Sequence, residues 1–448
     1  MNKTISARFQ LTLFKEETME FKKHIVGVML FAAVLSATSV LSAGDKKTTS
    51  VGPQQVQPKI LAEFGIPRDG SDLITIPITL KSGPFPLTQR KRTYRFLLDM
   101  GSSTVSTFDV TLRDQLGEAL GKRTVTLAGG RIQTFEYFRW PDAKIGKLSV
   151  DLKSTVACND FQDIRRRWRL PFHGVLSLDF WKKHVFRLDF DRGKLTILSA
   201  APSDSGTQIP IEFSKGGSPL ISVQLPGNQE SKCLLSPTPS ATMLLHPDRF
   251  NKLVSEGHLH TAGRPRDIPI AIGKWYEGRG ALDRVKVGRF THRAVSVASA
   301  INKENYDAVG LKFFARYRVT VDLPNKCLYL KKGAGFDRID SGQQSGMFFE
   351  FKVNDKPAPI NDKPTPIVVH KVLDGTPAQK AGFLPGDVIT HINNEDVSKL
   401  SIFRISELRA ISGKVTMTVK RDNKELSLTM IPKDEPEKKV KQKTAKKK

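Results

Sequence analysis

The run VVHKVLDGTPAQKAGFLPGDVITHINNEDV (368–397) is the most informative stretch for the fold. Thr376 is placed to cap a short helix that has Pro377 at its first position, and Gly382 is placed to end that helix. Pro385-Gly386 then turns the chain into a strand with the sequence DVITHI. The run therefore predicts a strand, a one-turn helix and a second strand in that order.

The segments that follow extend this pattern. Apolar residues at helical spacing in LSIFRISELRAI (400–411) predict a helix, and KVTMTVKRD (414–422) and KELSLTMI (424–431) predict a closing hairpin. In this order the elements resemble a bacterial PDZ domain, which we expect at residues 345–433. The resemblance implies a β-sandwich or barrel with short helices that binds C-terminal peptides by strand addition.

The resemblance also implies a set of peptide-binding residues. In PDZ domains a loop of the form Gly-φ-x-φ precedes the binding strand, and its backbone amides hold the terminal carboxylate of the peptide. The segment SGMFFEFKV (345–353) fits this form. The expected loop residues are Gly346, Met347, Phe348 and Phe349. Core packing is the alternative role for these aromatic residues, and Ile405 and Leu408 on the later helix can line either the pocket or the core.

The larger part of the chain consists of short apolar strands separated by turn residues, and its two halves contain similar segments in the same order. The pairs are DLITIPI (72–78) with PLISVQL (219–225), KIGKLSVDLKSTV (144–156) with KVGRFTHRAVSVA (286–298), and GVLSLDFWKKHVFRLDFDRGKLTIL (174–198) with DAVGLKFFARYRVTVDLPNKCLYL (307–330). We therefore expect a mainly β, duplicated body with lobe one at 70–200 and lobe two at 217–335. Residues 44–69 and 201–216 are expected to be linkers.

The run FLLDMGSS (96–103) is the candidate catalytic site. An apolar strand leads into Asp99, and Gly101 permits a tight turn; a carboxylate there is costly unless it is hydrogen-bonded or functional. Together with GVLSLDF and AVGLKFF, the run resembles the signature of pepsin- and retropepsin-type aspartic proteases. The resemblance implies catalytic roles for Asp99, Gly101 and Ser102, a two-lobed acid-protease fold, and a flap hairpin at 122–138 over a polypeptide substrate.

The second lobe departs from this pattern. The family mechanism needs one aspartate from each lobe, and the two share a proton. Aligning CLLSPTPSATML (233–244) with FLLDMGSSTVST places Ser236 where the second aspartate is expected. Thr238, between two prolines, takes the place of the glycine, and Met100 in lobe one replaces the usual Thr or Ser. Lobe two is therefore expected to be degenerate.

Three functions remain open for this combination. The first is an extracytoplasmic protein that handles peptides, with catalysis impaired by the missing aspartate. The second is an active aspartic endopeptidase, in which two lobe-one units meet in a homodimer or another acid is recruited. The third is a polyanion-binding surface protein. A serine hydrolase is disfavoured because Ser236 lacks the Gly-x-Ser-x-Gly elbow, although His246 lies nearby in the sequence.

Charge and cysteine content restrict the partners. The 448 residues carry a formal net charge of +26, part of it in a Lys-rich tail at 434–448. The tail is expected to be solvated, with weak contact at most to a polyanion or a membrane surface, and no motif indicates a specific nucleic acid. Cys158, Cys233 and Cys327 lack zinc-site spacing and are expected in the core, with one bridge allowed. No metal or cofactor is expected.

The N-terminal region has the features of an export signal. Lys22, Lys23 and His24 precede an uncharged apolar run at 25–43 that closes on small residues. We expect residues 1–43 to be an N-terminal extension followed by a signal peptide, with Met19 as an alternative start. An uncleaved membrane anchor is the other interpretation, because the run is close to the length of a span. Both interpretations place the remaining chain outside the cytoplasm, secreted or periplasmic.

Overall fold

A computed structural model describes most of the chain between residues 57 and 431. The ranges inside it that are not described are 81–91, 102–104, 127–131, 151–153, 238–240, 262–267, 271–272, 276–277, 300–305, 339, 341–344, 352–365 and 410–413. The expected signal peptide and the Lys-rich tail lie outside the described residues. None of the described helices is long and apolar enough to cross a membrane.

Nine of the described strands of lobe one form one sheet. Their order is β5 (Gly121–Thr126), β6 (Ile132–Arg139), β9 (Thr155–Asn159), β4 (Thr107–Asp109), β10 (Gly174–Leu176), β3 (Arg92–Leu98), β2 (Thr75–Leu80), β7 (Ala143–Ile145) and β8 (Leu148–Val150). Strand β2 shows why these residues fold as they do, since Ile76, Ile78 and Leu80 are buried and alternate with partly exposed residues. Lobe one also contains the helices η2 (Val110–Gln115), α2 (Gln162–Trp168) and α3 (Leu178–Trp181).

Lobe two repeats much of this arrangement. Its sheet has the order β14 (Glu212–Phe213), β15 (Pro219–Leu225), β16 (Gln229–Leu235), β23 (Ala308–Val309), β17 (Met243–Leu245), β22 (Phe290–Ser299), β21 (Arg279–Val287) and β18 (Leu259–Thr261). The small strands β19 (Ile268–Ile270) and β20 (Gly273–Trp275) pair with each other. The helices of this lobe are α4 (Pro247–Ser255) and α5 (Leu311–Phe314).

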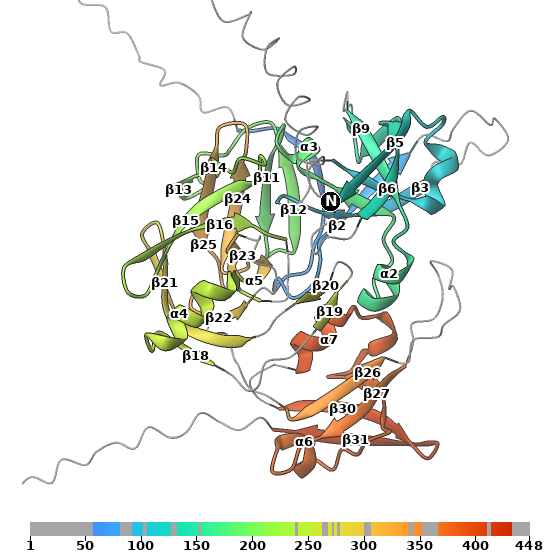
Figure 1. The fold of residues 1–448 in the computed structure, drawn as a ribbon, viewed down its shortest axis with the longest axis vertical. Helices are drawn as coiled ribbons and strands as arrows, with labels where there is room; N and C mark the ends of the chain where they lie inside the picture. Colours follow the sequence, from blue (N-terminus) through green and yellow to red (C-terminus); the bar gives the residue numbers. More distant parts are fainter. Residues whose placement is uncertain are drawn as a thin grey trace, which may run out of the picture. The chain divides into compact units, whose positions relative to one another are not determined.

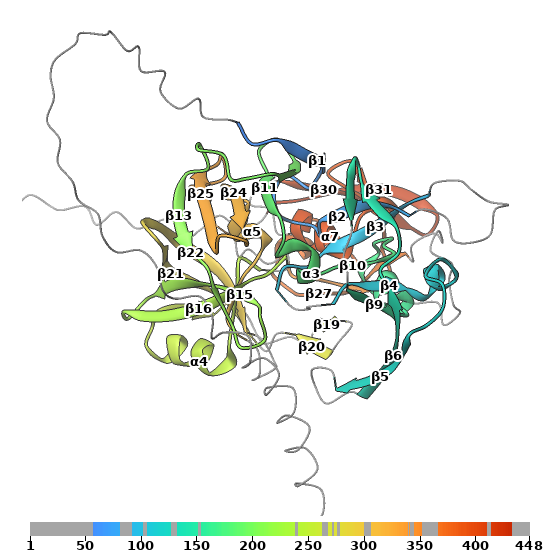
Figure 2. The same cartoon turned by 90° about the horizontal axis from the view of Figure 1, so that it is seen from above.

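A further sheet, which we call the shared sheet, is built from both lobes. Its order is β1 (Ile60–Gly65), β12 (Lys194–Leu198), β11 (Val185–Asp189), β24 (Tyr317–Asp322), β25 (Cys327–Lys332) and β13 (Thr207–Pro210). Strand β11 of lobe one pairs antiparallel with β24 of lobe two, and Figures 1 and 2 show the two strands side by side. One continuous hydrophobic core includes residues of both lobes. The lobes are therefore joined by hydrogen bonds and by packing.

Two expected linkers contain strands instead. Strand β1 lies within 44–69 and pairs with β12, and β13 lies within 201–216 and pairs with β25. Both segments are short, and both find their partners far along the chain. Their local sequences therefore carry little strand signal, although Ala62 and Ile209 are buried in the body. Strand β14, also within 201–216, pairs with β15, so the expectation of plain linkers was wrong for residues 60–65, 207–210 and 212–213.

The C-terminal module has the element order expected from its sequence. Its sheet runs β26 (Met347–Phe351), β27 (Ile367–Val372), β28 (Val388–Ile392), β30 (Val415–Arg421) and β31 (Lys424–Met430), and β29 (Glu395–Asp396) pairs with β28. The helices are α6 (Pro377–Lys380), η4 (Val397–Lys399) and α7 (Ile402–Arg409). Thr376 occupies the N-cap position of α6, but its hydroxyl donates to the carbonyl of Leu373 at 2.6 Å. The expected side-chain cap is therefore not formed.

Candidate functional site

Asp99 lies at the end of the buried strand β3. This strand pairs in parallel with β10, and the amide of Asp99 continues the pairing by donating to the carbonyl of Leu176 at 3.0 Å. Asp99 as a whole is 7% exposed, and Oδ1 of its carboxylate accepts a hydrogen bond from the Gly101 amide at 3.0 Å. A buried carboxylate that accepts from a turn amide is held in one orientation. Ser102 lies outside the described residues.

Ser236 occupies the matching position in lobe two. Strand β16 pairs in parallel with β23, and the amide of Ser236 donates to the carbonyl of Val309 at 2.9 Å. The residue that follows this parallel pairing therefore carries a carboxylate in lobe one and a hydroxyl in lobe two. Pro237 follows directly, and Thr238 lies outside the described residues.

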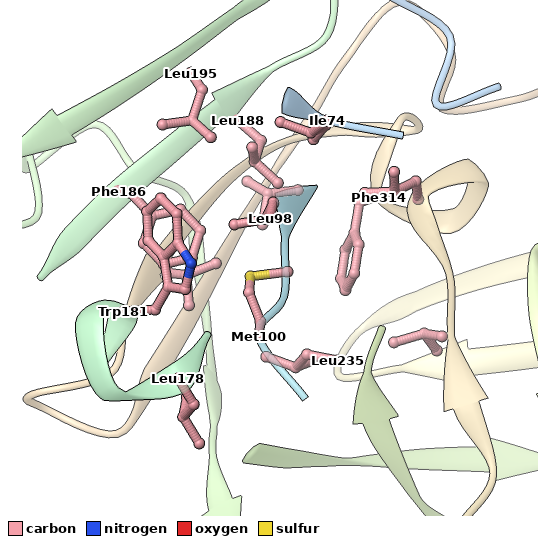
Figure 3. Packing of buried hydrophobic residues seen from close by; sticks show 14 of the residues in the cluster. Ile74, Leu98, Met100, Leu178, Trp181, Phe186, Leu188, Leu195, Leu235 and Phe314 are labelled. Carbon is pink, nitrogen blue, oxygen red and sulfur yellow. The ribbon is translucent and has the colours of Figure 1, made fainter. Parts of the chain in front are cut away.

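The two turns meet where the lobes come together. A Cβ added at Gly101 would lie 2.8 Å from the carbonyl oxygen of Leu235, the residue before Ser236. Glycine is required at this position because any side chain would press on the backbone of the other lobe. Figure 3 shows Met100 beside Leu235, with Phe314 also in this part of the core.

Met100 gives this contact a hydrophobic character. Its side chain is 1% exposed and belongs to the core that the lobes share. A thioether is at best a weak hydrogen-bond acceptor and donates nothing. A Thr or Ser at this position can donate a hydrogen bond, and Met100 cannot. The turn in lobe one is therefore held against lobe two by packing at this residue.

A buried polar cluster anchors the far end of the Asp99 loop. The hydroxyl of Ser106 donates to Oδ1 of Asp179 at 2.6 Å and accepts from the amide of Ser177 at 2.9 Å. All three residues are buried, and Asp179 lies in the first turn of α3. In α5, the matching helix of lobe two, the corresponding residue is Lys312. This cluster was not predicted, and the one signal for it in the sequence is an acid inside the apolar run 174–181.

The expected flap is a hairpin in its described part. Strands β5 and β6 pair antiparallel from Gly121 opposite Tyr137 to Thr126 opposite Ile132. The expected turn at Ala128-Gly129-Gly130 lies outside the described residues.

His246 has a structural role next to helix α4. It occupies the N-cap position, where its ring Nδ1 accepts from the amide of Asp248 at 3.3 Å, and its own amide donates to Asp307 at 2.6 Å. These bonds fix the start of a helix, as N-cap residues commonly do.

The three cysteines are buried and free, so the bridge that the sequence allowed is not formed. Burial raises the pKa of the Cys158 thiol to about 11 and also raises that of Cys233. Both thiols are therefore protonated at neutral pH and are poor nucleophiles. Among the described residues, no group of His, Cys, Asp and Glu side chains is placed to hold a metal ion.

The expected peptide-binding loop begins the first strand of the C-terminal module. Gly346 has φ +77°, and a Cβ added to it would lie 2.3 Å from the side chain of Thr376. Its carbonyl accepts from the amide of Leu373 at 2.9 Å, which holds the loop against the segment before α6. The residue must therefore be glycine for both conformational and steric reasons.

Strand β26 follows the loop and is the terminal strand of the described sheet, paired with β27. Met347 is 2% exposed and belongs to the core of the module, whereas Phe348 and Phe349 are partly exposed and Phe349 packs against that core. On α7, Ile405 is fully buried in the same core. Of the two roles open to Ile405 and Leu408, the structure favours core packing, and Met347, which was expected in the loop, is also a core residue.

A terminal strand preceded by a tight glycine loop, in a sheet flanked by a helix, is the arrangement that PDZ domains use for strand addition. A family model of the PDZ domain matches residues 345–431. The C-terminal module is a PDZ domain. Its matched range agrees with the 345–433 expected from the sequence.

Solved structures give two further likenesses. The PDZ domain is similar to that of HtrA3 bound to a phage-derived ligand (FGRWV), with 19% identity, a TM-score of 0.17, and coverage of 20% of this chain and 85% of that one. An aspartic proteinase from Irpex lacteus is similar over 61% of this chain and 98% of that one, with 13% identity and a TM-score of 0.37. No protein with a curated description matches the chain.

Proposed function

We propose that the protein binds and handles polypeptides, and that its aspartic-protease-like body lacks the ordinary catalytic dyad. The observation that carries this proposal is the equivalence of Asp99 and Ser236. Each residue ends a strand with the same parallel pairing, and the two turns touch through Gly101 and the carbonyl of Leu235. The repeated pairing also supports an origin of the two lobes by duplication.

The chemistry of such a pair differs from that of two carboxylates. Two aspartates at close range share one proton, so that one activates water while the other polarises the substrate carbonyl. A serine hydroxyl stays protonated at ordinary pH, and it does not compete with Asp99 for a proton. The pair can therefore bind a peptide backbone by hydrogen bonds, but it does not reproduce the shared-proton state.

A cleavage assay with restored residues tests this proposal. The full-length protein, incubated with a peptide library from about pH 4 to about pH 7.5, should produce no cleavage, and Asp99→Asn should change nothing. Replacing residues 236–239 with Asp-Thr-Gly-Ser, together with Met100→Thr, should produce pepstatin-sensitive cleavage. Ser236→Asp alone should not, because Pro237 remains and a misplacement of about 1 Å can cost roughly a hundredfold in rate.

The opposite result would favour the active alternatives. If the wild-type protein cleaves peptides and loses that activity on Asp99→Asn, catalysis is intrinsic. A dimer of lobe-one units or a recruited acid would then replace the proposal. Sedimentation of the active fraction would distinguish these two, because only the first requires association of two chains.

We also propose that the PDZ domain binds peptides with a free, hydrophobic C-terminus along β26. The family match and the terminal position of β26 in the sheet support this proposal. Titration of the full chain with such a peptide should give micromolar affinity, about −8 kcal/mol. The same peptide with an amidated C-terminus should bind at least about tenfold more weakly, since it lacks the carboxylate. Equal affinity of the two peptides would reject this mode of binding.

The place of action remains a proposal from the sequence. The apolar run at 25–43 after Lys22 and Lys23 supports export from the cytoplasm. Fractionation of cells that make the full chain, with N-terminal sequencing of the product, would test it. Recovery of the intact chain in the cytoplasmic fraction would contradict it.

A further inference from the structure

The outer hairpin of lobe two carries a group of exposed cations. Strands β21 and β22 form this hairpin, and its turn joins Val287 to Phe290. We call the following set the basic patch: Arg284, Lys286, Arg289 and Arg293. All four side chains are exposed.

Two members of the basic patch face each other across the hairpin. Arg284 and Arg293 are directly opposite in the antiparallel register. Like charges in such a pair destabilise a sheet, because their side chains lie within about 5 Å at Cβ. A protein keeps such a pair at a cost to its stability.

Carboxylates do not neutralise this group. Across the described part of the chain, no ion pair links a basic-patch residue to an acid, although Arg289 lies over the ring of Phe290 at 5.3 Å. Elsewhere in lobe two the exposed Lys232 pairs with Glu212, and Arg249 pairs with Asp307. The basic patch therefore presents unopposed positive charge.

The surface around Arg284 is hollowed on both sides. One hollow is also lined by Arg293, His258 and Asp283, and the other by Lys286, Arg289, Thr291, Gln224 and Asn228. The acid among them, Asp283, interacts with the ring of His260 at 2.9 Å. The hollows thus combine cations with hydroxyl and amide groups.

An interruption in the hairpin produces this arrangement. Asp283 and Ala294 would be opposite each other in the register but are not paired, and Ala294 has φ +50°, a left-handed conformation that costs an alanine stability. The register is the same on both sides of the interruption, but the alternation changes, because Leu282 is buried before it and Val285 after it. This change leaves the side chain of Arg284 exposed. Strained backbone conformations cluster at functional sites.

We propose that the basic patch is a binding site for an acidic polysaccharide, which it holds through sulfate or carboxylate groups. The cations form a row, because residues two apart on a strand are about 7 Å apart, and a row suits a linear chain with repeated charges. Thr291, Gln224 and Asn228 can bind sugar hydroxyls beside that row.

The same surface suits other polyanions less well. Nucleic acids without a base-specific groove are usually held by aromatic stacking, and Phe290 is only 5% exposed beneath Arg289. Membrane surfaces also favour exposed apolar side chains, and among the described residues the large exposed ones lie outside this hairpin. Electrostatic and hydroxyl contacts therefore carry the recognition.

Charge-matched variants of the full chain test the proposal. The patch variant is R284Q/K286Q/R289Q/R293Q, and the control is K438Q/K439Q/K446Q/K447Q in the tail, which removes the same number of charges. Binding of a size-defined heparin oligosaccharide is measured at several salt concentrations. The patch variant should bind at least about tenfold more weakly, and its salt slope should fall by about three to four. The tail variant should change affinity less than about threefold.

Folding and selectivity are checked in the same samples. The thermal midpoint of the patch variant should equal or exceed that of the wild type, because the repulsion between Arg284 and Arg293 is gone. If the fourfold variant does not fold, Arg293→Gln alone should weaken heparin binding about threefold. An equal loss of heparin affinity in the patch and tail variants would show that the basic patch is not the binding site. Patch-dependent binding of a single-stranded oligonucleotide or phosphatidylserine vesicles, as tight as that of heparin, would overturn the assignment to a polysaccharide.

Discussion

Acidification should weaken lobe two through His292. This residue lies on β22 and is 4% exposed, in contact with the rings of Phe313 and Phe336 and hydrogen-bonded to the hydroxyl of Tyr317. Burial, and then the positive charge of Arg316, lower its pKa from 6.5 to about 4. The folded protein therefore keeps His292 neutral over a range in which an unfolded chain protonates it.

The direction and size of the change in folding stability follow from this difference in pKa. Below pH 6.5 the unfolded state binds a proton that the folded state does not bind until about pH 4, so stability falls with falling pH in that window. Integration from about pH 7.5 to about pH 4.5 gives a loss of about 2.5 kcal/mol. That loss is a large fraction of the stability of a typical domain.

Peptide-resolved hydrogen exchange measures this effect in the full chain. The wild type is compared with His292→Phe/Tyr317→Phe, which removes both partners and leaves neither polar group buried alone. At each pH the opening free energy of peptides from β22 is compared between the two proteins, so other titrating groups cancel. The wild type should lose about 2.5 kcal/mol relative to the variant between the two pH values.

A difference in opening free energy that does not change with pH would refute the role of His292. If the two proteins keep the same relative opening free energy across the range, within about 0.5 kcal/mol, His292 must titrate alike in both states. Burial would then not control its protonation. A difference of the opposite sign would mean that protonation stabilises the fold, for example through Asp337 and Asp340, whose charges act to raise the pKa of His292.

Two further predictions concern glycines. Gly346→Ala should destabilise the PDZ domain by roughly 2 kcal/mol more than the control Gly375→Ala. Both glycines have φ near +70°, but only a Cβ at Gly346 would lie against the side chain of Thr376, at 2.3 Å. Equal unfolding midpoints for the two variants would show that this clash is relieved at no cost. Gly101→Ala should cost about 1–3 kcal/mol in the body, because its Cβ would lie 2.8 Å from the Leu235 carbonyl; an unchanged urea midpoint would mean that the turns do not press on each other.

Local pattern predicted the elements that have strong periodicity. The alternation in 72–80 and 92–100 predicted β2 and β3, and turn chemistry around Gly382 predicted the order of the PDZ elements. The repeated segments predicted that Asp99 and Ser236 align, and the structure places both at the ends of equivalent strands. These features depend on short stretches of chain, which a sequence displays directly.

The missed features depend on partners far along the chain. Strand β1 pairs with β12, and Ser106 meets Asp179 only after the chain has returned through β10. The basic patch depends on the unpaired residues Asp283 and Ala294, and the sequence does not show where the alternation of buried and exposed residues changes along a strand. Such long-range and irregular contacts leave almost no local trace.

The shared sheet has a consequence for how this protein can change over time. Because β11 and β24 pair across the lobes, deleting either lobe would leave the other with an open edge and a bare hydrophobic face. The side chain of Ser236 can change without touching this pairing, because only its backbone amide continues the strand contact. Natural selection on folding alone is therefore enough to preserve lobe two as a scaffold, whatever the chemistry of the side chains at the lobe contact.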